Sequence, residues 1–298
     1  ALPRPGVTPL ADAPLASTAV KAAPGVAATP VSSLAVNTSR VASWIPWPGN
    51  AQPRLIAFDV SNPAAPSAAP ALAVGPADAT TTAVKAASDG LVVLGYDRWN
   101  TRTIARQGNR PASPQSELLH AVQVIVVPTT GTAATRPAID LPGSLFAVTE
   151  LSAQGFLAYT RTVAPDGGAL LQASACDGWD AFQIAQLKVA VTGPVAAAGR
   201  SIYYTEDATV SCLALTTAGR FVPTGTIKSS WAPGELRVLD GRLLGSTWRR
   251  LFSAPVDTLS KPSEWSFKTG FDLQAIEGAA DGSLVVPMGD YGYELARP

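Results

Sequence analysis

The chain has 298 residues, of which 47% are hydrophobic and 15% are charged, so it can bury a large core, and disorder is excluded over most of its length. Its 22 acidic and 22 basic side chains give a formal net charge of zero, which offers no general attraction to nucleic acid or to an anionic membrane surface. The longest apolar run, Leu118 to Pro128, is too short to cross a bilayer, so no membrane insertion is expected.

The first 30 residues are rich in alanine and proline and show little periodicity, which predicts an extended N-terminal arm over residues 1–30. The chain begins at Ala1, which fits either a mature protein whose signal peptide has been removed or a trimmed chain. Abundant alanine, proline, serine and threonine with little lysine favour export. We therefore expect a bacterial protein that is secreted, periplasmic or on the cell surface.

Six hairpin patterns follow the arm, each made of an apolar stretch, a turn and a second apolar stretch. The first spans Leu34 to Val41, and the turns of the others are centred on Gly90, Gly155, Gly199, Gly241 and Gly282. The last four turns are separated by 44, 42 and 41 residues, which is the length of one four-stranded propeller blade. Helical periodicity is nowhere sustained. The spacing predicts one all-β β-propeller domain over residues 31–298.

The predicted blades are antiparallel and have four strands, numbered from the centre outward. The predicted strands are 34–36, 40–45, 55–60 and 71–74; 83–86, 91–96, 121–127 and 137–141; 145–151, 156–160, 170–176 and 182–191; 201–204, 210–215 and 222–228; 236–239, 243–247, 251–254 and 265–268. Six blades are expected, with five and seven as alternatives. The last blade, with 284–286 and 291–295, is a strand short, so we expect the arm to supply a strand and close the ring.

One predicted strand carries a recognisable motif. Residues 55–66 read Leu-Ile-Ala-Phe-Asp-Val-Ser-Asn-Pro-Ala-Ala-Pro, in which an apolar strand runs into Asp-Val-Ser-Asn-Pro and a second proline follows. Asp and Ser can bind nearby backbone amides, and the prolines prevent the strand from continuing. The segment resembles the repeats of LVIVD-type β-propellers over this blade alone. The resemblance implies an exported bacterial or archaeal propeller with no shared catalytic residues.

The residues of most catalytic sites are missing. His120 is the only histidine and lies within an apolar strand, so we expect it to be a packed or edge-strand residue. The chain contains no nucleophile elbow, phosphate-binding loop or pair of histidines at metal-binding spacing, so no cofactor or metal is expected. The five Asp-Gly dipeptides lack the alternating oxygen ligands of a calcium loop, and they predict turns.

Four carboxylates leave an enzymatic alternative open. Asp97, Glu206, Asp207 and Asp290 each follow the second strand of a blade and would lie on one rim of the ring. Paired carboxylates are sufficient for a carbohydrate hydrolase or lyase. The competing interpretation is that these side chains are solvated loop charges.

Aromatic and charged residues also gather at the ends of the second strands, whose following loops share one face of a propeller. The predicted binding residues are Trp44, Trp47, Tyr96, Asp97, Arg98, Trp99, Arg102, Tyr204, Glu206, Trp248, Arg249, Tyr291 and Tyr293. Aromatic and arginine side chains dominate binding hot spots, although aromatics at strand ends also wedge blades together. A long insertion loop, residues 98–117, is rich in arginine. We predict a non-catalytic binding or assembly module for a protein or glycan partner, as a subunit of a larger extracellular assembly.

The two cysteines, Cys176 and Cys212, are 36 residues apart in neighbouring repeats. In an exported protein a disulfide between them is expected. Two buried thiols are the alternative.

Overall fold

The computed structural model describes residues 32–37, 40–45, 53–62, 64–86, 90–104, 113–164, 168–259 and 261–297; for 32–37, 41–45, 102–104 and 113–114 only the backbone is described. Within these residues the strands form six antiparallel sheets, named I to VI in chain order. No helix in this part of the chain is long and apolar enough to cross a membrane.

Sheets I to III hold the first thirteen strands. Sheet I contains β1 (Ser32–Asn37), β2 (Arg40–Ile45), β3 (Arg54–Asp59), β4 (Ser67–Ala68) and β5 (Leu72–Ala73); sheet II contains β6 (Thr80–Ala86), β7 (Leu91–Ile104), β8 (Ser113–Val126) and β9 (Ala134–Leu141); sheet III contains β10 (Ser144–Ser152), β11 (Gly155–Val163), β12 (Ala169–Cys176) and β13 (Ala181–Val189).

Sheets IV to VI complete the described fold. Sheet IV contains β14 (Val195–Ala198), β15 (Ser201–Glu206), β16 (Thr209–Leu215) and β17 (Phe221–Lys228); sheet V contains β18 (Glu235–Leu239), β19 (Arg242–Thr247), β20 (Arg250–Pro255) and β21 (Ser263–Ser266); sheet VI contains β22 (Glu277–Gly278), β23 (Leu284–Pro287) and β24 (Tyr293–Ala296). Two short 3-10 turns, η1 (Leu273–Ala275) and η2 (Gly289–Tyr291), flank β22 and β23.

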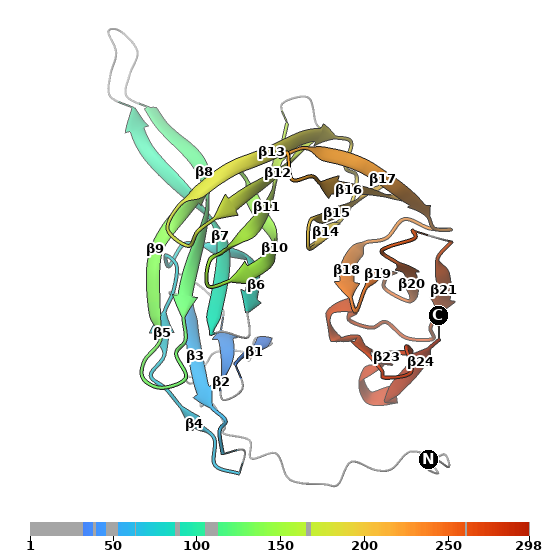
Figure 1. The fold of residues 1–298 in the computed structure, drawn as a ribbon, viewed down its shortest axis with the longest axis horizontal. Helices are drawn as coiled ribbons and strands as arrows, with labels where there is room; N and C mark the ends of the chain where they lie inside the picture. Colours follow the sequence, from blue (N-terminus) through green and yellow to red (C-terminus); the bar gives the residue numbers. More distant parts are fainter. Residues whose placement is uncertain are drawn as a thin grey trace.

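The sheets are arranged around a common centre (Figure 1). Strands that are consecutive in sequence are neighbours in each sheet, except that β4 and β5 both pair with β3. The first strands of adjacent sheets contact one another: β1 with β6, β6 with β10, β10 with β14, and β14 with β18. The first strand of each of these sheets is therefore the innermost one, as predicted. The prediction of an all-β chain is confirmed.

All six predicted hairpins form the connection between the first and second strands of a sheet. Glycine is required at some of these turns. At Gly155 the φ angle is 139°, and a Cβ atom there would lie 2.2 Å from the carbonyl oxygen of Cys176. The proposed closing strand from residues 1–30 lies outside the described residues.

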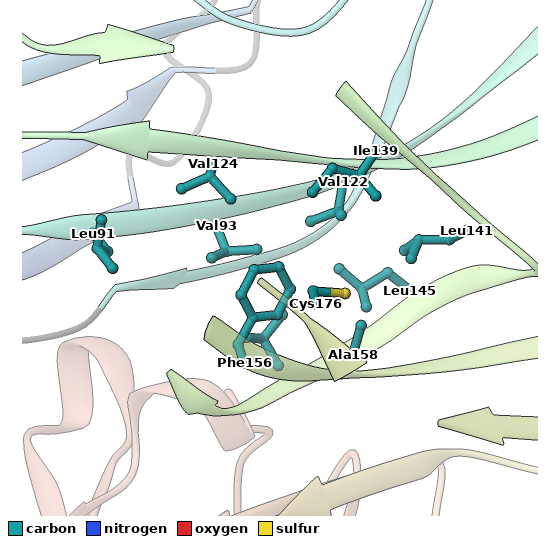
Figure 2. Packing of buried hydrophobic residues seen from close by; sticks show 11 residues of the cluster. Leu91, Val93, Val122, Val124, Ile139, Leu141, Leu145, Phe156, Ala158 and Cys176 are labelled. Atoms are coloured by element: carbon teal, nitrogen blue, oxygen red, sulfur yellow. The ribbon is translucent and has the colours of Figure 1, made fainter. Parts of the chain in front are cut away.

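The core lies between the faces of neighbouring sheets because side chains alternate along each strand. In β7, Val92 and Leu94 face sheet I, whereas Leu91 and Val93 face sheet III. Figure 2 shows the second of these layers, in which residues of β7, β8 and β9 pack against residues of sheet III such as Phe156. Three further layers of this kind lie between sheets III and IV, IV and V, and V and VI.

The two cysteines face opposite ways, so the predicted disulfide is wrong. Cys176 on β12 packs in the layer between sheets II and III, and Cys212 on β16 packs in the layer between sheets IV and V. Both are free, buried thiols. Although they lie on equivalent strands of neighbouring sheets, their side chains point away from each other.

The Asp-Val-Ser-Asn-Pro motif ends β3 through local hydrogen bonds. Asp59 accepts from the backbone nitrogen of Ser61 at 3.0 Å and from its hydroxyl at 2.6 Å, which lowers the pKa of Asp59. Asp59 also lies 3.5 Å from the guanidinium of Arg40, whose Nε donates at 3.1 Å to the carbonyl oxygen of Thr129, in the connection between β8 and β9 of sheet II. The motif therefore contributes to the seam between sheets I and II as well as to the turn.

Two hydroxyl groups from sheet III hold the turn of sheet IV. Tyr159 and Thr149 donate to the same carbonyl oxygen, that of Gly199, at 3.0 and 2.7 Å. We expect Tyr159→Phe or Thr149→Val alone to cost about 1 kcal/mol of unfolding free energy, because the other donor remains. The double variant leaves the carbonyl oxygen of Gly199 with neither donor and is expected to cost more than the sum of the two. Urea unfolding of the unchanged protein, the two single variants and the double variant measures these costs. Additive costs would contradict the prediction.

The long insertion predicted as a loop over residues 98–117 is instead largely a β-hairpin. The ladder between β7 and β8 continues without a bulge from the pair Arg98 and Leu119 to the pair Ile104 and Ser113. Residues 98–104 are rich in residues with high β-propensity, namely tryptophan, threonine and isoleucine, which explains the extension. We call residues 98–104 and 113–119 the ribbon.

Candidate functional site

The ribbon projects beyond the rest of sheet II (Figure 1). Toward the ribbon, the pairing of β7 with β6 ends at Asp97, and the pairing of β8 with β9 ends at His120. Beyond these two residues the described hairpin has only two strands. Neither edge of the described hairpin therefore pairs with a further described strand.

A polar pair marks the base of the ribbon. Nδ1 of His120 lies 2.7 Å from Oδ1 of Asp97, its cross-strand partner, and each side chain is 16% exposed. His120 is on an interior strand and is packed, which agrees with the packed alternative of the sequence prediction. Its acidic partner was not foreseen, although the two residues face each other in the ladder. Asp97 thus joins the two strands where the ribbon begins.

The ribbon carries an exposed apolar pair. Trp99 on β7 and Leu118 on β8 are cross-strand partners on the same face, and Trp99 is 63% exposed. The next pair on that face, Thr101 and Ser116, is joined by a hydrogen bond of 2.9 Å between the two hydroxyl groups. The pair of Trp99 and Leu118 is thus followed along the ribbon by a pair whose side chains are hydrogen-bonded across the strands.

A cleft of about 400 Å³ lies on the opposite face of the same hairpin, in the seam between sheets I and II. Tyr96, Arg98 and Asp140 line it. Burial raises the pKa of Tyr96, the nearby Arg98 opposes this rise, and Asp140 adds to it. Gln123 closes the cleft by accepting from the backbone nitrogen of Gly75 at 2.9 Å and donating to the carbonyl oxygen of Arg136 at 3.0 Å. The cleft can therefore offer a neutral phenol, a cation and an anion to a small polar group.

A second exposed aromatic surface lies on sheets V and VI. Trp248, which connects β19 to β20, is 72% exposed, and the guanidinium carbon of Arg249 lies 4.3 Å from the centroid of its ring. The ring also covers Gly270, where a Cβ atom would lie 2.0 Å from Nε1 of Trp248. Tyr291 in η2 and Tyr293 in β24 are exposed as well.

The remaining predicted binding residues are distributed as follows. Tyr204 is partly buried against the core between sheets III and IV, and Glu206 is exposed at the end of β15. Trp44 and Arg102 lie on β2 and β7, and their side chains are outside the described part of the structure, as is the whole of Trp47.

The predicted aromatic residues do not form one continuous surface. Figure 1 shows the ribbon on the opposite side of the molecule from sheets V and VI. The structure therefore separates the ribbon, with Trp99, from the surface around Trp248. Another exposed aromatic was not predicted at all: Trp179, in the turn between β12 and β13, lies under Arg136 with 5.0 Å from the guanidinium carbon to the ring centroid. Its position just after an Asp-Gly turn was the available signal.

The four candidate catalytic carboxylates do not line the cleft between sheets I and II, nor a larger cavity of about 810 Å³ between sheets V and VI. Asp140 is the one acid that lines the cleft, and Asp281 is the one acid that lines the larger cavity. Neither cavity therefore offers the pair of carboxylates on which glycoside hydrolysis depends.

Comparison with known proteins bears on the fold. No protein-family model and no curated protein matches the chain. Among solved structures, that of Hsv2p from Kluyveromyces lactis matches with a TM-score of 0.52 and 9% identity, covering 90% of this chain and 74% of that chain. The chain has a β-propeller fold. Hsv2 from Kluyveromyces marxianus matches with a TM-score of 0.48 and 8% identity, covering 86% of this chain and 68% of that chain.

Proposed function

We propose that this chain is a non-catalytic binding module that contacts a protein partner through the ribbon. The observation that carries the proposal is the two-stranded extension of β7 and β8 beyond Asp97 and His120, which exposes Trp99. The absence of a carboxylate pair in either cavity favours binding over the alternative of a carbohydrate hydrolase or lyase.

An uncovered ribbon is physically costly. A two-stranded hairpin without a packed face is only marginally stable in water, and its open edges invite pairing with other chains. Exposed tryptophan contributes large contact area at a small entropic cost. A partner that covers the face of Trp99 and Leu118, or adds a strand to an edge, would offset these costs. A glycan could cover the face of Trp99 and Leu118 but could not add a strand to an edge, so we favour a protein.

Charge indicates the chemistry of the partner surface. Arg98 is exposed and makes no hydrogen bond or ion pair with the rest of the described chain, and Arg102 lies on the same strand. The one acid of the described ribbon is Glu117. The partner that fits best therefore presents an apolar surface to Trp99 and Leu118 and acidic residues to the opposite face of the ribbon, where Arg98 lies.

The proposal includes the context of the module. We infer an exported protein of the LVIVD-like type, acting in a larger extracellular assembly, in which residues 1–30 close the ring. The described part of sheet VI supports closure because it has three strands and the outer edge of β24 pairs with no described strand.

The test compares variants of the full chain in capture from the envelope and culture fluid of the source organism, followed by affinity measurement with each captured protein. Trp99→Ala is expected to weaken binding at least tenfold, as at a binding hot spot. Trp179→Ala is the matched control, because Trp179 is 59% exposed against 63% for Trp99 but lies outside the ribbon. The control should change the affinity less than twofold.

A second variant removes the ribbon without disturbing sheet II. Residues 99–118 are replaced by Asn-Gly, which closes a two-residue turn between the paired residues Arg98 and Leu119. Binding should be lost while the circular dichroism spectrum keeps its β signature. The proposal fails if the affinity survives this replacement, or if the captured partner is a polysaccharide.

A further inference from the structure

The larger cavity, of about 810 Å³, lies in the seam between sheets V and VI. One wall comes from β19, β20 and the start of β21, and includes Arg242, Ser253 and Ser263. The other wall comes from the turn between β22 and β23, with Asp281 and Ser283. This end of the sheets carries the turns between first and second strands, so it is opposite to the end that carries Trp248.

Positive charge is concentrated in this cavity. Arg242, Lys261 and Arg297 line it, against the single acid Asp281. The lining therefore has a formal charge of +2, in a chain whose formal net charge is zero. The three cations come from distant parts of the chain and are brought together by the seam. Cations gathered in this way, with no matching set of acids, form a site for an anion.

Arg242 is held in position before any ligand arrives. Its Nε donates to the hydroxyl of Ser253 at 2.6 Å, and Ser253 is 1% exposed. The terminal amino groups of Arg242 make no hydrogen bond elsewhere in the described chain. They remain available to form a two-pronged contact with a carboxylate or phosphate.

Asp281 gives the cavity a second function. It accepts a hydrogen bond of 3.0 Å from the backbone nitrogen of Ser283, and the hydrogen bonds from Ser283, followed by the charge of Arg297, lower the pKa of Asp281. The carboxylate is therefore ionised at neutral pH and can only accept hydrogen bonds. It repels a bare anion but binds hydroxyl groups, which are the donors that a sugar supplies.

We propose that this cavity binds an acidic sugar, a ring bearing hydroxyl groups together with one carboxylate or phosphate group. The anionic group contacts Arg242 and Arg297, and sugar hydroxyls donate to Asp281. A neutral sugar would leave the cations without a partner, and a simple inorganic anion would meet the charge of Asp281 without offering it a donor.

The test measures binding by isothermal titration calorimetry at constant ionic strength with glucuronate, glucose 6-phosphate, glucose and inorganic phosphate. Both acidic sugars are expected to bind with dissociation constants in the millimolar range or below, and glucose and inorganic phosphate at least tenfold more weakly. The two acidic probes distinguish a carboxylated from a phosphorylated ligand. The proposal is overturned if glucose and glucuronate bind equally. It is also overturned if neither acidic sugar binds at a concentration of about 10 mM, which is above the expected millimolar dissociation constants.

Variants assign the binding to this cavity. Arg242→Gln combined with Arg297→Gln is expected to weaken binding of the acidic sugars at least tenfold. Lys261→Gln, which changes an exposed side chain, is expected to weaken it severalfold. Arg220→Gln removes an exposed arginine from the turn between β16 and β17 and should leave the affinity unchanged. Asp281→Asn keeps a side-chain oxygen that accepts from Ser283. It should weaken the binding of the acidic sugars and strengthen the binding of inorganic phosphate. Unchanged affinity in the first two variants overturns the assignment.

This site is independent of the ribbon. Trp99→Ala should leave the affinity for acidic sugars unchanged, since sheets V and VI lie across the ring from the ribbon (Figure 1). Loss of partner binding without loss of sugar binding, or the reverse, therefore tests the two proposals separately.

Discussion

Replacing Phe252 with alanine is expected to lower the free energy of unfolding by about 4 kcal/mol, the cost of emptying a fully buried aromatic site. Phe252 has no exposed surface, and its ring centroid lies 5.7 Å from that of Trp231. The ring also covers its cross-strand partner Gly245, where a Cβ atom would lie 2.1 Å from Cε1 of Phe252. Gly245→Ala alone is therefore expected to cost about 2 kcal/mol through overpacking.

The two substitutions should not be additive. Once Phe252 is alanine, the space that the new methyl group at Gly245 needs is free, so the second substitution should cost little or nothing. Urea unfolding of the two single variants and the double variant gives a coupling energy, expected to be about 2 kcal/mol. Gly234→Ala is the control, because its Cβ atom would meet only the carbonyl oxygen of Ser246 at 3.7 Å. Additive costs, or an equal loss at Gly234, would show that the ring does not determine the residue at 245.

The local features of this fold were predictable from the sequence. Each hairpin between a first and a second strand has its turn residue and its alternating apolar residues close together, so the spacing of Gly155, Gly199, Gly241 and Gly282 was sufficient to place these strands. The turn formed by the Asp-Val-Ser-Asn-Pro motif was predictable for the same reason, since its hydrogen bonds join residues two positions apart.

The features that depend on distant residues were not predictable. The ribbon requires Trp99 to pair with Leu118 and Thr101 with Ser116, and nothing within residues 98–104 specifies that partner. The direction in which the side chains of Cys176 and Cys212 point depends on which neighbouring sheet covers each face of their strands. The cavity between sheets V and VI draws its cations from three separate segments, none of which is basic by itself.

The two buried thiols should make the protein less stable in alkali. Burial, followed by the charge of nearby Asp177, raises the pKa of Cys176 from the ordinary value of 9.0 to about 12, and burial also raises the pKa of Cys212. The stability that these protonated thiols contribute is complete below pH 9. It is lost as the pH rises through their pKa in the folded protein, because the thiols of the unfolded chain ionise first. Cys176 alone should remove about 1 kcal/mol between pH 9 and 10, and up to about 1.4 kcal/mol for each unit above that.

This pH window separates the thiols from the other buried acids. Burial raises the pKa of Tyr159 and of Tyr203 from 10.0 to about 12, so the tyrosines contribute mainly above pH 10. The loss between pH 9 and 10 is therefore expected to shrink by about 1 kcal/mol in Cys176→Ala, and to remain in Tyr159→Phe. In native protein neither thiol should react with a thiol reagent, and two should react after unfolding without reductant. A disulfide would instead leave no reactive thiol and would remove the cysteine contribution to the loss in this window, because bonded sulfur has no proton to release.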